Sequence, residues 1–70
     1  MKRTGVSSSN MVSIGYNADK QILEIEFIGG SVYQYYDVPA DVHEDMMASD
    51  SKGKFLRERV GHQFKYNKIS

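Results

Sequence analysis

The sequence predicts an α+β domain: a three-stranded antiparallel β-meander packed on two short α-helices, with a short C-terminal extended segment or fourth strand. Three observations indicate this class. Apolar and polar residues alternate in the first half of the chain, a pair of glycines separates two strand-like stretches, and a proline opens the first stretch with helical spacing. A chain of 70 residues is long enough for one domain only.

Residues 1–9 are polar and include three consecutive serines, so we expect a flexible N-terminal tail. A single domain then occupies residues 10–70. Its first strand covers residues 11–16, and turn-forming residues follow at 17–21. The apolar face of this strand carries Val12, Ile14 and Tyr16. Consecutive strands joined by short connections usually pair, which predicts the antiparallel meander.

Residues 22–39 form the centre of the predicted fold. Three apolar residues alternate here with two carboxylates, so one face of the strand is apolar and the other is polar. The apolar residues are Leu23, Ile25 and Phe27, and the carboxylates are Glu24 and Glu26. Gly29 and Gly30 supply the positive φ that a tight reversal requires. Val32–Val38, rich in β-branched and aromatic residues, returns as the next strand.

The register of this hairpin has two solutions. A two-residue loop, 29–30, pairs Phe27 with Val32 and leaves Tyr33 and Tyr35 on the outer face with the glutamates. A slip by one residue moves every side chain of a strand to the other face of the sheet.

The second solution is a three-residue loop, 29–31, which pairs Phe27 with Tyr33. It places Tyr33 and Tyr35 against the core. We favour it, because the shorter loop buries Gln34 without an identifiable hydrogen-bond partner.

Pro39 stands where proline is favoured, in the first turn of a helix that runs from about residue 40 to residue 49. The spacing of its apolar residues predicts a narrow stripe that faces the core rather than a binding surface. These residues are Val42, Met46 and Met47.

A second helix begins at Asp50 or Ser51, both of which are favoured N-cap residues. Its inward-facing residues are Phe55, Leu56 and Val60. Gly61 ends this helix. Aromatic and basic residues alternate in the following segment, 62–69, as in a short strand or an extended segment on the core.

The composition excludes several classes of protein. The chain has no cysteine, so it contains no disulfide and no thiolate metal site. Its first residues lack the apolar region of a signal peptide, and no stretch approaches the roughly 20 apolar residues of a membrane span. We therefore expect a cytoplasmic protein that contacts no membrane.

The sequence also predicts no enzyme, no cofactor and no metal site. His43 and His62 are far apart and have no ligand-forming neighbours at helical or strand spacing, so we expect both on the surface. No arrangement of nucleophile and base stands out, and the chain is short for an enclosed pocket.

The net charge is zero, but the charges are unevenly distributed. Residues 1–50 hold three basic and eight acidic residues, whereas residues 51–70 hold six basic residues and one acidic residue. A basic segment is typical of a surface that faces nucleic acid, and the alternative is that the two halves attract each other within one fold. The candidate phosphate contacts are Lys52, Lys54, Arg57, Arg59, Lys65 and Lys68.

Tyr33 and Tyr35 are candidates for stacking on nucleic-acid bases. The alternative is that both rings anchor a core too small to form without large aromatic residues. We favour the core, in keeping with the three-residue loop.

With these segments in place, the chain resembles the KTSC domain, which is named after the C-terminal region of some lysyl-tRNA synthetases and also occurs as a free-standing bacterial protein. The resemblance covers roughly residues 10–69. It depends on the segments Ile14–Tyr16, Leu23–Phe27, Tyr33–Tyr35, Val38–Pro39, Ser49–Phe55 and Phe64–Tyr66. RNA binding is the function that the resemblance implies.

Together these observations predict a small monomeric binding module that contacts RNA or another nucleic acid through its basic C-terminal surface. The alternative is a protein–protein interaction module that recognises a partner by a sheet edge or by the region of Met46 and Met47.

Overall fold

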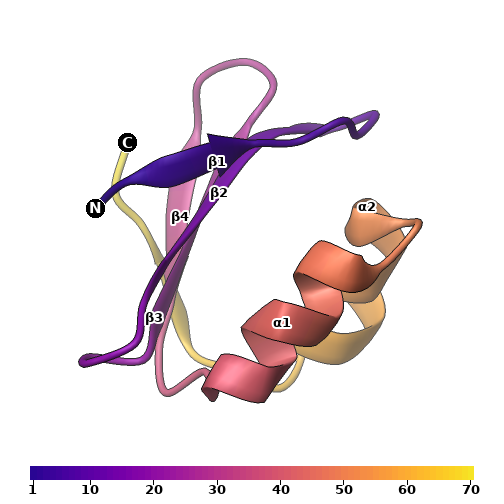
Figure 1. Cartoon of the computed structure of the whole chain (residues 1–70). Coiled ribbons are helices and arrows are strands. Elements are labelled where there is room, and N and C mark those ends of the chain that lie inside the picture. Colours follow the sequence, from indigo (N-terminus) through magenta and orange to yellow (C-terminus); the bar gives the residue numbers. More distant parts are fainter.

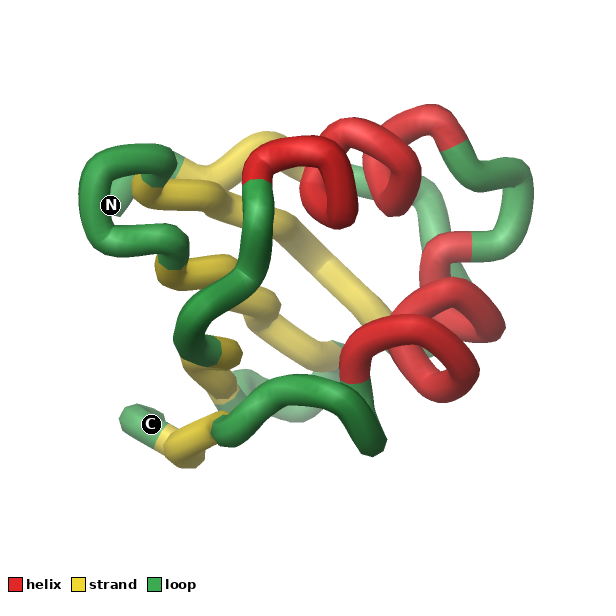
Figure 2. The backbone as a smooth tube through the Cα atoms, turned by 90° about the horizontal axis from the view of Figure 1, so that it is seen from below, coloured by secondary structure: helices red, strands yellow, loops and turns green.

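A five-stranded antiparallel sheet forms one layer of the protein, and helices pack on one of its faces (Figures 1 and 2). The computed structural model describes residues 1–70. Its strands, which lie in the sheet in chain order, are β1 (Arg3–Gly5), β2 (Met11–Asn17), β3 (Ile22–Phe27), β4 (Val32–Tyr35) and β5 (Tyr66–Lys68). The helices are α1 (Ala40–Ala48), α2 (Lys52–Phe55) and a π-helical turn that continues α2, η1 (Leu56–Val60). None of them has the length and apolar character that crossing a membrane requires.

The α+β class and the antiparallel meander agree with the sequence prediction, but the prediction of three strands was too low. β1 lies within residues 1–9, where we expected a flexible tail, and pairs with β2. β5 pairs with β4, so the C-terminal segment forms a strand. Both added strands have only three residues and largely exposed side chains, so they lack the apolar alternation that identifies a strand in a sequence. They pair instead with the free backbone groups of the adjacent strands.

The β3–β4 hairpin adopts neither predicted register, yet it keeps the face that we favoured for the tyrosines. Ile25 lies opposite Tyr33, and Leu23 lies opposite Tyr35. Both tyrosines therefore share the helix-facing side of the sheet with the apolar residues of β3. Tyr35 is 7% exposed and belongs to the core, and Tyr33 packs against that core.

The hairpin loop has three residues, as expected, but begins one residue earlier, at residue 28. The amide of Gly30 donates to the carbonyl of Phe27 at 3.1 Å, and the amide of Phe27 donates to the carbonyl of Ser31 at 2.8 Å. Gly29 and Gly30 have φ of 102° and 98°. The pairing therefore differs from the favoured register by two positions, and an even shift leaves each side chain on its predicted face.

A bulge in β2 changes which of its residues are buried. The pairing with β3 shifts between Met11 and Ser13, so Met11 joins Ile14 on the core face. Met11 and Ile14 are each 1% exposed, whereas Val12 is 43% exposed. The prediction that Val12 faces the core was wrong, because the extra residue of a bulge reverses the alternation on one side of it.

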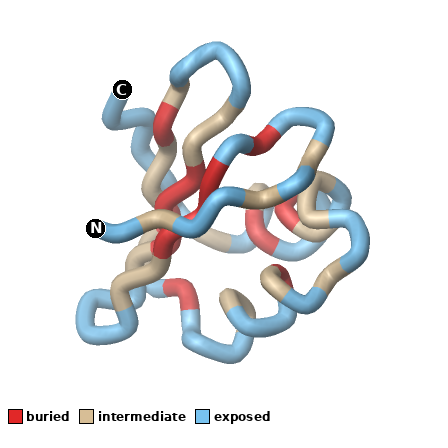
Figure 3. The backbone as a smooth tube through the Cα atoms, turned by 45° about the horizontal axis from the view of Figure 1, so that its top comes forward, coloured by how far each residue is buried: buried red, intermediate tan, exposed pale blue.

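The core is one apolar cluster between the sheet and the helices (Figure 3). Its buried members are Met11, Ile14, Leu23, Ile25, Tyr35, Val38, Met46, Leu56 and Val60. Met46 of the predicted stripe on α1 is fully buried, and Val42 and Met47 pack beside it. Both helices thus contribute the residues that their spacing predicts.

His43 joins α1 to β2 and is not the free surface residue that we expected. Its ring stacks on Tyr16, with the centroids 4.7 Å apart and the planes 9° from parallel. The hydroxyl of Tyr16 donates to the carbonyl of Val38, which fixes the Tyr16 ring of the stack. Burial lowers the pKa of His43, and the neighbouring Glu44 acts in the opposite direction. His62 is exposed, as predicted.

The opposite face of the sheet carries a connected layer of polar side chains. Glu24, only 7% exposed, accepts a hydrogen bond from Arg3 Nη1 at 2.6 Å and another from Gln34 Nε2 at 2.8 Å. Gln34 thus has its partner on this face. The glutamates lie on the polar face that the sequence predicts, but this face is not bare, because β1 brings a guanidinium over it.

Gly15 makes that contact possible. A Cβ atom at this position would lie 2.8 Å from Arg3 Cγ and 2.8 Å from the carbonyl oxygen of Lys2. Arg3 therefore crosses β2 only because residue 15 has no side chain.

We predict that Tyr35→Ala destabilises the protein by about 3 kcal/mol or more, because it opens a cavity in a small core. Thermal unfolding followed by circular dichroism measures the effect. Tyr35→Phe keeps the ring and is expected to unfold near the wild-type temperature. A wild-type melting curve for Tyr35→Ala would show that the ring lies outside the core.

Gly15→Ala is expected to displace β1 from the sheet, since the new Cβ meets backbone as well as the Arg3 side chain. Hydrogen exchange at the β1 amides measures the displacement. Gly5→Ala is the matched control, because nothing lies within 4 Å of a Cβ at that position. Equal protection of β1 in both variants would contradict the close approach of Arg3.

The stability of the protein is expected to fall on acidification through the pKa of an unfolded histidine, about 6.5. The folded-state pKa of His43 is lowered, so the unfolded chain takes up the proton first and is favoured as the pH falls. His43→Phe keeps a stacked ring that cannot titrate and should weaken this pH dependence. Denaturant unfolding at several pH values measures it, and identical pH profiles would contradict the assignment.

Candidate nucleic-acid interface

The six basic residues predicted to contact phosphate lie on the last third of the chain. Lys52 and Lys54 belong to α2, Arg57 and Arg59 to η1, and Lys68 to β5, with Lys65 just before that strand. Lys52 is partly exposed, and the other five are exposed. None of the six forms an ion pair, because both ion pairs of the structure join Arg3 to Glu24 or Glu26. No carboxylate of the acidic front half therefore forms a close ion pair with these cations.

The packing of the helical segment from α2 through η1 directs its basic side chains outward. Burying Leu56 and Val60 under the sheet turns the remaining sides of the same helical segment to solvent. Arg59 lies over the ring of Phe55, with its guanidinium carbon 5.2 Å from the ring centroid. This cation–π contact holds Arg59 on the helix while leaving its charge exposed.

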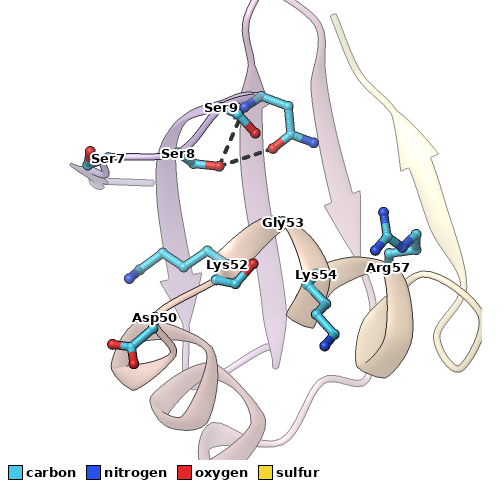
Figure 4. Close-up of a pocket in the computed structure, with 10 residues that line it drawn as sticks. Ser7, Ser8, Ser9, Asp50, Lys52, Gly53, Lys54 and Arg57 are labelled. Carbon is cyan, nitrogen blue, oxygen red and sulfur yellow. Dashed lines mark hydrogen bonds between the residues drawn. The ribbon is translucent and has the colours of Figure 1, made fainter.

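A polar cleft of about 560 Å³ brings three of the six together (Figure 4). One wall is residues 7–10, in the connection between β1 and β2, which we call the serine loop. The other wall is residues 50–54 together with Arg57, and it supplies Lys52, Lys54 and Arg57. Arg59, Lys65 and Lys68 lie outside the cleft. No hydrophobic residue lines it.

The two walls approach closely at Gly53. A Cβ atom at this position would lie 3.1 Å from Asn10 Oδ1, so a larger residue would press on the serine loop. Ser8 Oγ donates to the same Asn10 oxygen at 3.1 Å, which orders the loop. Lys52 Nζ donates to the carbonyl of Ser49 at 3.0 Å and lies below Ser7 and Ser8 in Figure 4.

Tyr33 and Tyr35, the stacking candidates from the sequence, differ in how much of each ring is exposed to a ligand. Burial raises the pKa of Tyr35, with smaller contributions from the nearby Tyr33 and Tyr66. At 7% exposure, Tyr35 has no ring face free for a base to stack on. Tyr33 is partly exposed, but Phe27 packs edge-on against its ring at 5.5 Å.

Tyr66 is an aromatic candidate that sequence reasoning did not name. It is 56% exposed, and its centroid lies 5.7 Å from that of Tyr33 and 5.6 Å from that of Tyr35. Lys68, two residues later in the same strand, projects on the same face of the sheet. The alternation of Tyr66 with basic residues was a visible signal, but its exposure depends on β5 being the edge strand.

The serine loop was also missed as part of a site. Its sequence has low complexity and carries no charge, so it predicts a flexible tail. Only the pairing of β1 with β2 brings it opposite α2. No group of three or more histidine, cysteine or acidic residues is placed to hold a metal ion.

Comparison with known proteins gives a family match over most of the chain. The family model of the KTSC domain matches residues 7–64, which include both walls of the cleft. A protein of Tsukamurella paurometabola is 40% identical over 60 residues, which are 86% of this chain and 90% of that protein. A lysine–tRNA ligase of a Nostoc species is 38% identical over 55 residues, which are 79% of this chain but 10% of the ligase.

A solved structure is similar over the whole chain. The crystal structure of a KTSC domain protein from Yersinia pestis superposes with a TM-score of 0.93 and 41% sequence identity. The alignment covers 99% of this chain and 97% of that one.

Proposed function

The chain belongs to the KTSC domain family, and from this premise we propose that it is a monomeric, cytoplasmic, non-catalytic module that binds RNA through its basic C-terminal residues. The observation that carries the proposal is the absence of any ion pair to the six cations Lys52, Lys54, Arg57, Arg59, Lys65 and Lys68. A surface cation without a close carboxylate partner is available to contact a phosphate. Phosphate contacts of this kind supply most of the affinity of non-specific nucleic-acid binding.

The relatives support a ligand of the RNA class. Segments similar to this chain occur in proteins named lysine–tRNA ligase, from a Nostoc species, Trichormus variabilis and Nostoc punctiforme. In each, the similar segment makes up 10% of a protein whose name gives tRNA as a substrate.

The distribution of charge favours the helical side of the molecule over the outer face of the sheet. Glu24 and Glu26 occupy that outer face and are paired with Arg3. Their carboxylates would repel phosphate. Tyr66 and Lys68, in contrast, place an exposed ring beside a cation, which suits a single strand with one base on the ring and phosphate on the ammonium group.

A protein-interaction module is less well supported by the same geometry. Met46 is fully buried and Met47 packs against the core, so this region offers no soft apolar surface. Both sheet edges, β1 and β5, are strands of three residues. Such short edges give an added strand few hydrogen bonds.

We predict salt-dependent binding of single-stranded RNA. Fluorescence anisotropy with a labelled short RNA at two salt concentrations measures it. The affinity should fall steeply as salt rises, by roughly 0.7 log unit per log unit of salt for each phosphate contact. The triple change of Lys52, Lys54 and Arg57 to Gln should remove most of the binding and reduce the salt slope by about 2. The same change at Arg59, Lys65 and Lys68 should also weaken binding.

The control is Lys2→Gln with Lys20→Gln, two exposed lysines on the acidic half. This double variant should bind RNA nearly as the wild type does. Circular dichroism verifies that every variant is folded. If the wild type fails to bind RNA even at low salt, the proposal is wrong; if all variants lose affinity equally, only net charge matters.

A further inference from the structure

We infer that the polar cleft between the serine loop and residues 50–57 binds a terminal phosphate group together with the sugar that carries it. The inference rests on the proposed function and deepens it. The ligand of the cleft is the terminal phosphate of an RNA strand, or the phosphate of a free nucleotide. The cations outside the cleft contact internal phosphates of the strand.

The charge of the cleft matches a phosphomonoester better than an internal phosphodiester. Lys52, Lys54 and Arg57 carry three positive charges and Asp50 one negative charge, which leaves a net charge of plus two. A terminal phosphate carries about −1.5 to −2 at pH 7. An internal diester carries only a single negative charge per phosphate and would leave half of the cleft charge unmatched.

Free hydrogen-bond donors surround this charge. The hydroxyls of Ser7 and Ser9 donate to no protein group, and Asn10 uses only its oxygen, so its amide NH₂ is free. The exposed Lys54 and Arg57 side chains form no hydrogen bond or ion pair. In Figure 4 they point in different directions, with Lys54 turned away from the serine loop. Long exposed cations of this kind can turn onto a ligand, and bonds from cations to phosphate are stronger than those between neutral groups.

Lys52 contributes an ammonium group that a hydrogen bond holds in the wall of the cleft. One of its protons is given to the carbonyl of Ser49 at 3.0 Å, which leaves two for a ligand. Asp50 accepts no hydrogen bond and forms no ion pair. In Figure 4 Asp50 lies toward the Lys52 end of the cleft, away from Arg57. An acceptor at that end suits a ribose, because its hydroxyl groups can donate to the carboxylate while the phosphate accepts from the cations.

The cleft offers no binding surface for the base of a nucleotide. Its volume of about 560 Å³ is that of a small-molecule site, but no hydrophobic or aromatic residue lines it. A base has no ring to stack on there, so it remains outside. We therefore expect recognition of the phosphorylated end without regard to the identity of the base.

The first experiment compares three RNAs of one sequence by anisotropy: 5′-phosphorylated, 3′-phosphorylated and unphosphorylated. One phosphorylated form should bind the wild type about tenfold more tightly than the unphosphorylated form. This preference should shrink as the pH falls below about 6, because the monoester takes up a proton. Lys54→Gln should abolish the preference. Lys65→Gln, which removes the same charge outside the cleft, should weaken all three RNAs alike and keep the preference.

The second experiment identifies the source of the phosphate. Uridine 5′-monophosphate, uridine, inorganic phosphate and the three RNAs are each titrated while the backbone amide NMR signals of residues 7–10 and Gly53 are followed. Saturable shifts with the monophosphate but not with uridine support the cleft site and extend it to free nucleotides. Shifts only with phosphorylated RNA confine it to strand ends.

The two proposals fail in different ways. Salt-dependent binding of all three RNAs with equal affinity, without shifts in the serine loop, overturns the cleft site and leaves RNA binding intact. Failure of every RNA to bind, with saturable shifts from the monophosphate, overturns RNA binding and makes the cleft a nucleotide site. Shifts from all three small molecules alike, uridine included, overturn phosphate recognition.

Discussion

Arg3 holds the N-terminal strand on the sheet, and the candidate site depends on that attachment. Its guanidinium lies 2.6 Å from Glu24 and 3.7 Å from Glu26, on a path left open by Gly15. With β1 in place, the connection to β2 is a short loop closed by a hydrogen bond from the Val6 amide to the Val12 carbonyl at 3.1 Å. That loop is one wall of the cleft. Without β1, the serines would have no fixed position opposite α2.

The other wall follows from the core. Leu56 and Val60 are 7% and 0% exposed, so the segment from α2 through η1 lies against the sheet along one side. The basic residues between them are thereby forced outward. The segment ends with a π-helical hydrogen bond from the Gly61 amide to the Leu56 carbonyl at 2.7 Å. The position of this segment on the sheet therefore both fills the core and exposes the basic side chains.

The hairpin illustrates how far sequence reasoning extends. The need to satisfy Gln34 correctly favoured the face assignment of Tyr33 and Tyr35, although the loop begins at residue 28 rather than residue 29. On the outer face Gln34 has a hydrogen-bond partner, since its Nε2 donates to the carboxylate of Glu24 at 2.8 Å. Val12 was misplaced because a bulge has no signature in alternating residues. The six cations were identified by composition alone, whereas the loop that completes the cleft was not.

By itself the sequence determined the class of the fold, the two helices, the central hairpin and the excess of positive charge at the C-terminal end, because these follow from periodicity, turn residues and local charge. Only the tertiary structure decided that β1 and β5 complete the sheet and that the serine loop faces Lys52. Local patterns cannot show this, since each three-residue strand is too short to carry a periodic signal. Each strand is held in position by backbone pairing, and β1 also by a long-range ion pair between residues 21 positions apart.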